Sequence, residues 1–81
     1  MNQPKKALSN PRRISDINLA AYCLAREYRL ADFKKGPRSE FIFQDVPEEV
    51  ILSYYGGDDQ ISARKLLDAL KNLKGILAGV R

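Results

Sequence analysis

The sequence predicts a small α+β domain in which a two-stranded antiparallel hairpin packs on three helices, in the order α-β-β-α-α. Three observations support this fold class: three segments carry apolar residues at helical spacing, two short segments are rich in aromatic residues, and turn residues join those two. We expect a flexible basic leader over residues 1–13 and one domain over residues 14–81. A chain of 81 residues with 44% apolar content can bury a real core, although its stability stays marginal.

The first helix is predicted over residues 17–27. Ser15 and Asp16 are favoured N-cap residues, and Ile14 before them can pack back on the first turn. One face is apolar at the spacing i, i+3, i+4, i+7 and is expected to be buried: Ile17, Ala20, Ala21 and Leu24. A second stripe at the same spacing is expected on the wetter side: Asn18, Tyr22 and Arg26.

The hairpin is predicted from strands at residues 28–33 and 39–44, joined by the loop at residues 34–38. Because side chains alternate along a strand, Leu30 and Phe41 are expected on the face that the helices cover. The opposite face would then carry three apolar side chains: Ala31, Phe33 and Ile42. Either this face is an exposed binding surface, or the last helix covers it as well.

Another helix is predicted directly after the hairpin. Asp45 is expected to cap it, with Pro47 in its first turn and Glu48 completing a capping box. The helix runs to about residue 55, because the glycine pair 56–57 favours a left-handed conformation that ends it.

The last helix is predicted to begin after Asp59 or Ser62 and to continue to about residue 77, since its leucines follow helical spacing. Ser62 and Lys65 also match the serine–lysine spacing of penicillin-recognising enzymes, but the partner motifs are absent, so we expect Ser62 to be an N-cap. Asp58 and Asp59 could offer carboxylates to a divalent cation. No calcium-loop spacing accompanies them, and we expect a turn there.

Four short motifs stand in order along residues 14–78: Ser15-Asp16, Leu19-Ala20-Ala21, Phe41-Ile42-Phe43 and Leu73-Lys74. A capped start, an Ala-rich helix, a hairpin ending in an aromatic-x-aromatic pair and a C-terminal helix with a Leu-Lys step resemble a family of small bacterial and phage domains of unknown function. The resemblance implies the same α-β-β-α-α fold and no mechanism, because that family has no assigned activity. Glu27 stands near the place where the family has a glycine at the end of its first helix.

The charges of the chain are unevenly distributed. All four charged residues of the leader are cations: Lys5, Lys6, Arg12 and Arg13. Residues 14–81 hold ten Lys and Arg against ten Asp and Glu, so the predicted domain is neutral in sum. The basic character that suggests a nucleic-acid partner therefore attaches mainly to the leader.

Two functions follow as predictions. The first is weak contact with nucleic acid that is indifferent to sequence, through the leader and a second cationic cluster at the hairpin turn: Lys34, Lys35 and Arg38. The alternative role of that cluster is a solubilising turn that discourages edge pairing. The second function is a protein-interaction or homodimerisation module that uses the outer hairpin face with Ala31, Phe33 and Ile42. The four tyrosines could stack on bases, but core packing is the expected role.

The composition argues against most catalytic and metal-binding functions. The chain holds no histidine, which removes the commonest general base and metal ligand, and its single cysteine cannot form an internal disulfide. Cys23 lies on an apolar helix, where a buried structural thiol is expected. The longest apolar run, residues 19–25, is too short to span a membrane. We therefore predict a cytoplasmic, non-enzymatic protein with no cofactor, no metal site and no membrane association.

Overall fold

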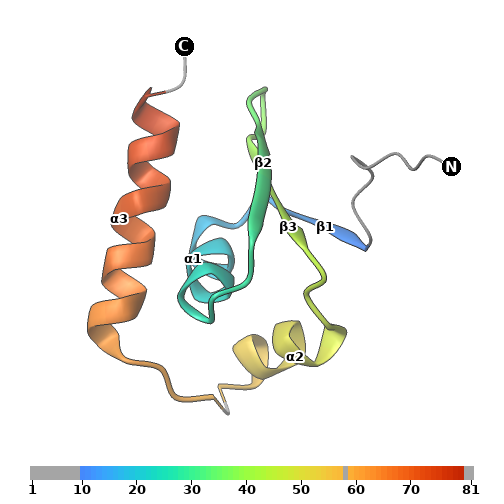
Figure 1. Ribbon diagram of the computed structural model, residues 1–81, viewed down its shortest axis with the longest axis vertical. Coiled ribbons are helices and arrows are strands. Elements are labelled where there is room, and N and C mark those ends of the chain that lie inside the picture. The colour runs from blue at the N-terminus through green and yellow to red at the C-terminus, as the bar shows by residue number, and fades with distance from the viewer. Residues whose placement is uncertain (1–9, 58, 80–81) are drawn as a thin grey trace, which may run out of the picture.

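The computed structural model describes residues 10–57 and 59–79. These residues form three strands and three helices in one small domain (Figure 1). In chain order the elements are β1 (Pro11–Ile14), α1 (Ile17–Ala25), β2 (Leu30–Lys34), β3 (Glu40–Gln44), α2 (Glu48–Gly56) and α3 (Ala63–Gly79). The α+β class is confirmed, but the sheet has three antiparallel strands where the sequence predicted two.

The additional strand, β1, lies where the sequence analysis placed the end of a flexible leader. β1 pairs antiparallel with β3, which gives the sheet order β1-β3-β2. Its register places Arg12 opposite Phe43 and Arg13 opposite Ile42. The leader boundary at residue 13 is therefore wrong for the last residues of that segment. Two consecutive arginines hide the strand pattern, and the pairing partner that stabilises the strand lies about 30 residues further along the chain.

Helix α1 is the centre of the fold and lies between the sheet and α3 (Figure 1). The carboxylate of Asp16 caps it as predicted, because Oδ1 accepts the backbone N–H groups of Asn18 at 2.9 Å and Leu19 at 3.4 Å. Most of the helix is buried, and its small side chains let neighbouring elements approach closely. The other fully buried large side chains come from β3 and α3: Phe41, Phe43 and Leu73.

The end of α1 is closed by a Schellman motif. The N–H of Tyr28 donates to the carbonyl of Cys23 at 3.1 Å, and the N–H of Glu27 donates to the carbonyl of Leu24 at 2.8 Å. This motif requires a left-handed residue, and Glu27 takes that conformation with φ 71°. A side chain with a Cβ pays a steric cost there that glycine avoids.

Glu27→Gly is expected to raise the free energy of unfolding by about 0.5–1 kcal/mol. The gain comes from relief of the left-handed strain. It exceeds the loss of the Glu27–Lys65 ion pair, which spans 3.2 Å between exposed side chains and contributes little. Urea denaturation measures the change. Glu27→Ala, which removes the same ion pair but keeps a Cβ, is the matched control and should not stabilise; a stabilising Glu27→Ala would contradict the explanation.

The predicted N-cap is wrong for α2 and confirmed for α3. The predicted Asp45 cap is wrong: Pro47 occupies the N-cap position, and Asp45 instead turns the chain out of β3 with a left-handed φ of 58°. At the other helix, the Oγ of Ser62 accepts the backbone N–H of Lys65 at 3.3 Å, so the serine is an N-cap as predicted. Gly57 ends α2 in the expected left-handed conformation. Within the described residues, no helix is both long enough and apolar enough to cross a membrane.

Candidate nucleic-acid interface

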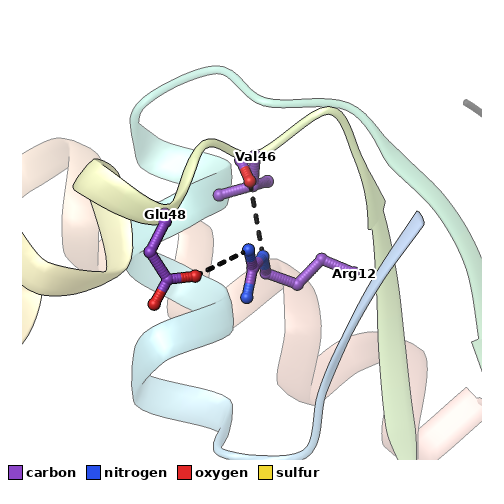
Figure 2. Close-up of polar contacts among 3 residues, drawn as sticks. All are labelled: Arg12, Val46 and Glu48. Atoms are coloured by element: carbon purple, nitrogen blue, oxygen red, sulfur yellow. Dashed lines mark hydrogen bonds and ion pairs between the residues drawn. The ribbon is translucent and has the colours of Figure 1, made fainter. Parts of the chain in front are cut away.

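Arg12, predicted to bind phosphate from the leader, is instead used inside the fold. Its guanidinium reaches from β1 to the start of α2, where Nε donates to the carbonyl of Val46 at 3.3 Å and Nη2 pairs with Glu48 at 3.0 Å (Figure 2). The side chain is about one-third exposed. This arginine therefore ties the edge strand to α2 and has little freedom to meet a ligand.

Of the other three leader cations, Arg13 is the one that lies in the part of the chain that the structure describes. Arg13 lies on the outer face of the sheet, and its Nε is 3.9 Å from a carboxylate oxygen of Glu40. Its side chain is 68% exposed, so this surface ion pair adds little stability. Lys5 and Lys6 lie outside the described residues. Half of the predicted leader cluster thus belongs to the sheet and has carboxylate partners.

A different set of cations gathers at one end of the molecule. The turn between β2 and β3 carries three exposed cations and no acid over residues 34–39: Lys34, Lys35 and Arg38. Residues 69–79 of α3 carry exposed Lys71 and Lys74, again without an acid. The hairpin turn and the C-terminal half of α3 lie at the same end of the fold (Figure 1). We call these five residues the cationic end.

Five of the ten acids stand in one segment of the chain, whereas Glu40 lies opposite Lys34 in the sheet. Residues 45–59 hold five acids and no base, and α2, which contains Glu48 and Glu49, lies at the end opposite the hairpin turn (Figure 1). Two arginines from earlier elements reach into this region: Arg12 pairs with Glu48, and Arg26 pairs with Asp59. With β1 included, residues 10–81 hold twelve Lys and Arg against ten Asp and Glu, so the domain is slightly basic. Its charge is also polarised, since folding brings two arginines to the acidic segment and leaves the cationic end exposed.

Asp59 fastens the chain between α2 and α3 onto α1. Its Oδ2 accepts a hydrogen bond from the hydroxyl of Tyr22 at 2.5 Å and also pairs with the guanidinium of Arg26, which lies over the tyrosine ring. Burial, together with the hydrogen bond to Asp59, raises the pKa of Tyr22 to about 12. The hydrogen bond from Tyr22, supported by the charge of Arg26, lowers the pKa of Asp59 below its ordinary value despite partial burial. We call Tyr22, Arg26 and Asp59 the clasp, because these residues hold the α2–α3 connection against α1.

The clasp predicts a pH dependence in the acid range. Because the pKa of Asp59 is lower in the folded state, its stabilising contribution is complete above the unfolded pKa of about 3.9 and is lost as the pH falls below it. Asp59→Asn is therefore expected to lower the melting temperature at neutral pH and to have a smaller effect at the acid end. Thermal melts across this range measure it. Tyr22→Phe, which removes the main cause of the pKa shift, should also flatten the acid-range profile. A constant difference between Asp59→Asn and wild type at every pH would contradict the assignment.

The predicted apolar outer face is not formed by the three residues proposed for it. A β-bulge between Leu30 and Asp32 shifts the alternation of β2, so Phe33 pairs with Phe41 on the core face, with ring centroids 5.1 Å apart. Ala31 lies in the bulge. Ile42 does face outward, but it is 5% exposed, and its cross-strand neighbours on that face are charged. The outer face is therefore mainly polar.

The other chemical candidates have structural roles. Lys65 directs its Nζ to Glu27 at 3.2 Å and does not activate Ser62. Cys23 is fully buried, and this burial raises the pKa of its thiol to about 11, which makes it a poor nucleophile. Asp58 lies outside the described residues. Among the residues that are described, no cluster of His, Cys, Asp or Glu could hold a metal ion.

Comparisons with protein-family models, with curated proteins and with solved structures found no match to this chain. The resemblance to small bacterial and phage domains therefore stays a prediction. The left-handed conformation of Glu27 is consistent with it, since glycine is favoured at this position of a Schellman motif.

Proposed function

We propose that the protein contacts nucleic acid weakly and without sequence preference through the cationic end. The observation that carries the proposal is the gathering of five exposed cations at one end of the fold, where Glu40, opposite Lys34, is the acid beside the hairpin segment. Cationic side chains at a β-hairpin turn can contact the phosphate backbone or enter a groove. The partial negative charge at the C-terminus of α3 offsets only about half a unit of this positive charge.

The size of the cluster sets the expected salt dependence. Each phosphate contact on a duplex lowers the slope of log K against log salt by about 0.9, so five contacts give a slope no steeper than about −4.5. Backbone contacts of this kind carry no base specificity. The affinity should therefore be measurable at low salt and should vary little between duplexes of different sequence.

Fluorescence anisotropy with a short labelled duplex tests the proposal. Arg38→Gln and Lys74→Gln each remove one cation from the cationic end, and each should reduce the magnitude of the salt slope by about one. Arg29→Gln removes an exposed cation at the opposite end of the hairpin and is the matched control. The control should bind as wild type does.

Two outcomes would overturn this site. If Arg29→Gln weakens binding as much as Lys74→Gln does, only the net charge matters. If deletion of residues 1–9 alone abolishes binding while Arg38→Gln and Lys74→Gln bind normally, the contact belongs to Lys5 and Lys6. Absence of binding by the wild-type protein at low salt would reject the function itself.

A further inference from the structure

β1 forms an edge of the sheet with backbone groups that face away from it. Among the residues that the structure describes, β1 pairs with β3 on one side and with no strand on the other. Hydrogen-bonded pairs alternate along the ladder from the bond between Asn10 and Asp45, so Arg12 makes the next backbone bonds to β3. The N–H and C=O of Arg13 and the C=O of Pro11 therefore point outward, and both residues are exposed. Such an edge is a template for another extended strand.

Two pockets lie beside this edge, between β1 and α2. The first has a volume of about 450 Å³ and reaches from the start of β1 to Glu48 in the first turn of α2. The second has a volume of about 210 Å³, and its apolar side chains come from β1, α1 and α2: Ile14, Leu19, Ile51 and Tyr55. Arg12 lines both pockets, and Figure 2 shows its side chain reaching across to Glu48. We call the outer edge of β1 and these two pockets the β1 groove.

The part of the β1 groove around Arg13 is suited to a carboxylate. The Arg13 side chain is 68% exposed, and its Nε approaches Glu40 no closer than 3.9 Å. Of the described residues that line the second pocket, Asp16 is the only acid. Its Oδ1 already accepts two backbone N–H groups in the first turn of α1. The guanidinium of Arg13 can therefore turn to an acidic side chain of a ligand, which would complement its charge.

A second copy of this chain is a poor occupant of the same edge. Within β1, the residues with outward backbone groups are Pro11 and Arg13. Pairing β1 with itself would place Arg13 opposite its own counterpart, and like charges directly opposite each other destabilise a strand pair. The other register would place Arg13 opposite Pro11, which has no N–H to donate. The edge thus discriminates against itself and favours a strand that carries an acid.

We propose that the β1 groove binds an extended segment of a partner protein, which adds to the sheet antiparallel to β1 with an acidic residue opposite Arg13. The N–H and C=O of Arg13 bond to the backbone of that residue, and its carboxylate lies beside the guanidinium. The residue before it stands opposite Ile14, and its apolar side chain points into the second pocket against Ile51 and Tyr55. Strand addition of this kind takes affinity from the main chain and specificity from alternate side chains.

The recognised pattern is therefore an apolar residue followed directly by an acidic one in an extended chain. The β1 groove uses none of the five residues of the cationic end, so this inference stands independently of the proposed function.

Selection from a random heptapeptide library tests the proposal. Peptides that bind the wild-type protein should be enriched in an acidic residue directly preceded by an apolar one. Arg13→Gln removes the charge but keeps the N–H, and it should weaken a selected peptide about two- to fivefold. Arg13→Pro also removes the outward N–H and should weaken it about tenfold or more. Arg64→Gln removes an exposed cation of α3, away from the groove, and should bind as wild type does.

A second pair of variants tests the pocket and applies even if Arg13→Pro fails to fold. Tyr55→Ala removes a wall of the second pocket that is 66% exposed, so binding should weaken several-fold and the preference for an apolar residue should disappear. Leu52→Ala is the matched control, since Leu52 is 60% exposed on the same helix but lines neither pocket. It should bind as wild type does.

Four outcomes would overturn the proposal. The library could give no enriched peptide, or a folded Arg13→Pro variant could bind as well as Arg13→Gln, which would exclude strand addition. Leu52→Ala could weaken binding as much as Tyr55→Ala, which would exclude the second pocket. A wild-type protein that sediments as a dimer, and as a monomer in the Arg13→Pro variant, would show that a second copy occupies the edge.

Discussion

Arg12→Pro is expected to remove more than half of the free energy of unfolding, whereas Arg13→Pro one residue away is expected to be tolerated. The N–H of Asp45 donates to the carbonyl of Asn10 at 3.1 Å, and hydrogen-bonded pairs alternate along an antiparallel ladder. The next hydrogen-bonded pair in the register is therefore Arg12 with Phe43, and the N–H of Arg13 points away from the sheet. Proline is tolerated on an edge strand only where the N–H faces outward.

The expected costs differ strongly. Arg12→Pro removes a ladder hydrogen bond, leaves a buried carbonyl without its donor and breaks the contacts to Val46 and Glu48, which together cost about 3 kcal/mol or more. A domain of this size has a total stability of about 5 kcal/mol. Arg13→Pro loses only an exposed ion pair and should cost about 1 kcal/mol or less.

Urea denaturation followed by circular dichroism measures both proline variants. Arg12→Ala separates the contribution of the side chain from that of the backbone. The same net charge is removed in all three variants, so charge does not explain a difference between them. Equal stabilities for Arg12→Pro, Arg13→Pro and wild type would show that β1 is not part of the folded sheet.

Phe43→Ala is expected to cost about 3–5 kcal/mol, which is most of the free energy of unfolding of a domain of this size. Phe43 is 0% exposed on the central strand, and its neighbours in the register are Arg12 on β1 and Leu30 on β2. Its removal opens a cavity between α1 and the sheet that these short elements cannot easily close. Calorimetry or denaturant titration gives the loss.

The outward neighbour Ile42 offers a comparison on the same strand. It is 5% exposed but is not packed into the main core cluster, so Ile42→Ala should cost clearly less than Phe43→Ala. Phe43→Leu, which retains much of the apolar volume, should recover part of the loss. An equal cost for Ile42→Ala and Phe43→Ala would mean that the core does not lie on the helix side of the sheet.

Local signals in the sequence predicted the helices and the hairpin well. Asp16 and Ser62 cap helices because their side-chain oxygens satisfy the backbone N–H groups of the next turn, and this needs no distant partner. Gly57 ends α2 for an equally local reason. The features that the sequence analysis missed depend on residues far apart in the chain.

Three such features explain why the candidate site differs from the one that the sequence predicted. β1 exists because β3 offers a free edge and because Glu48 holds Arg12, so two predicted phosphate ligands became parts of the sheet. A single bulged residue moved Phe33 to the core face. Tyr22, expected on the wetter side of α1, is buried because the α2–α3 connection folds back and places Asp59 on its hydroxyl. The residues that Arg12, Phe33 and Tyr22 contact lie at least eight positions away in the chain: Glu48, Phe41 and Asp59.

The central claim is that nucleic acid contacts the exposed cations of the cationic end, while Arg12 and Arg13 belong to the sheet. A titration of the isotope-labelled protein with a short DNA duplex, followed by backbone amide chemical shifts, tests it residue by residue. The account predicts shifts confined to residues 34–39 and 69–79 that disappear as salt is added. Shifts confined to residues 2–13, or to the α2 end where the acids lie, would contradict it.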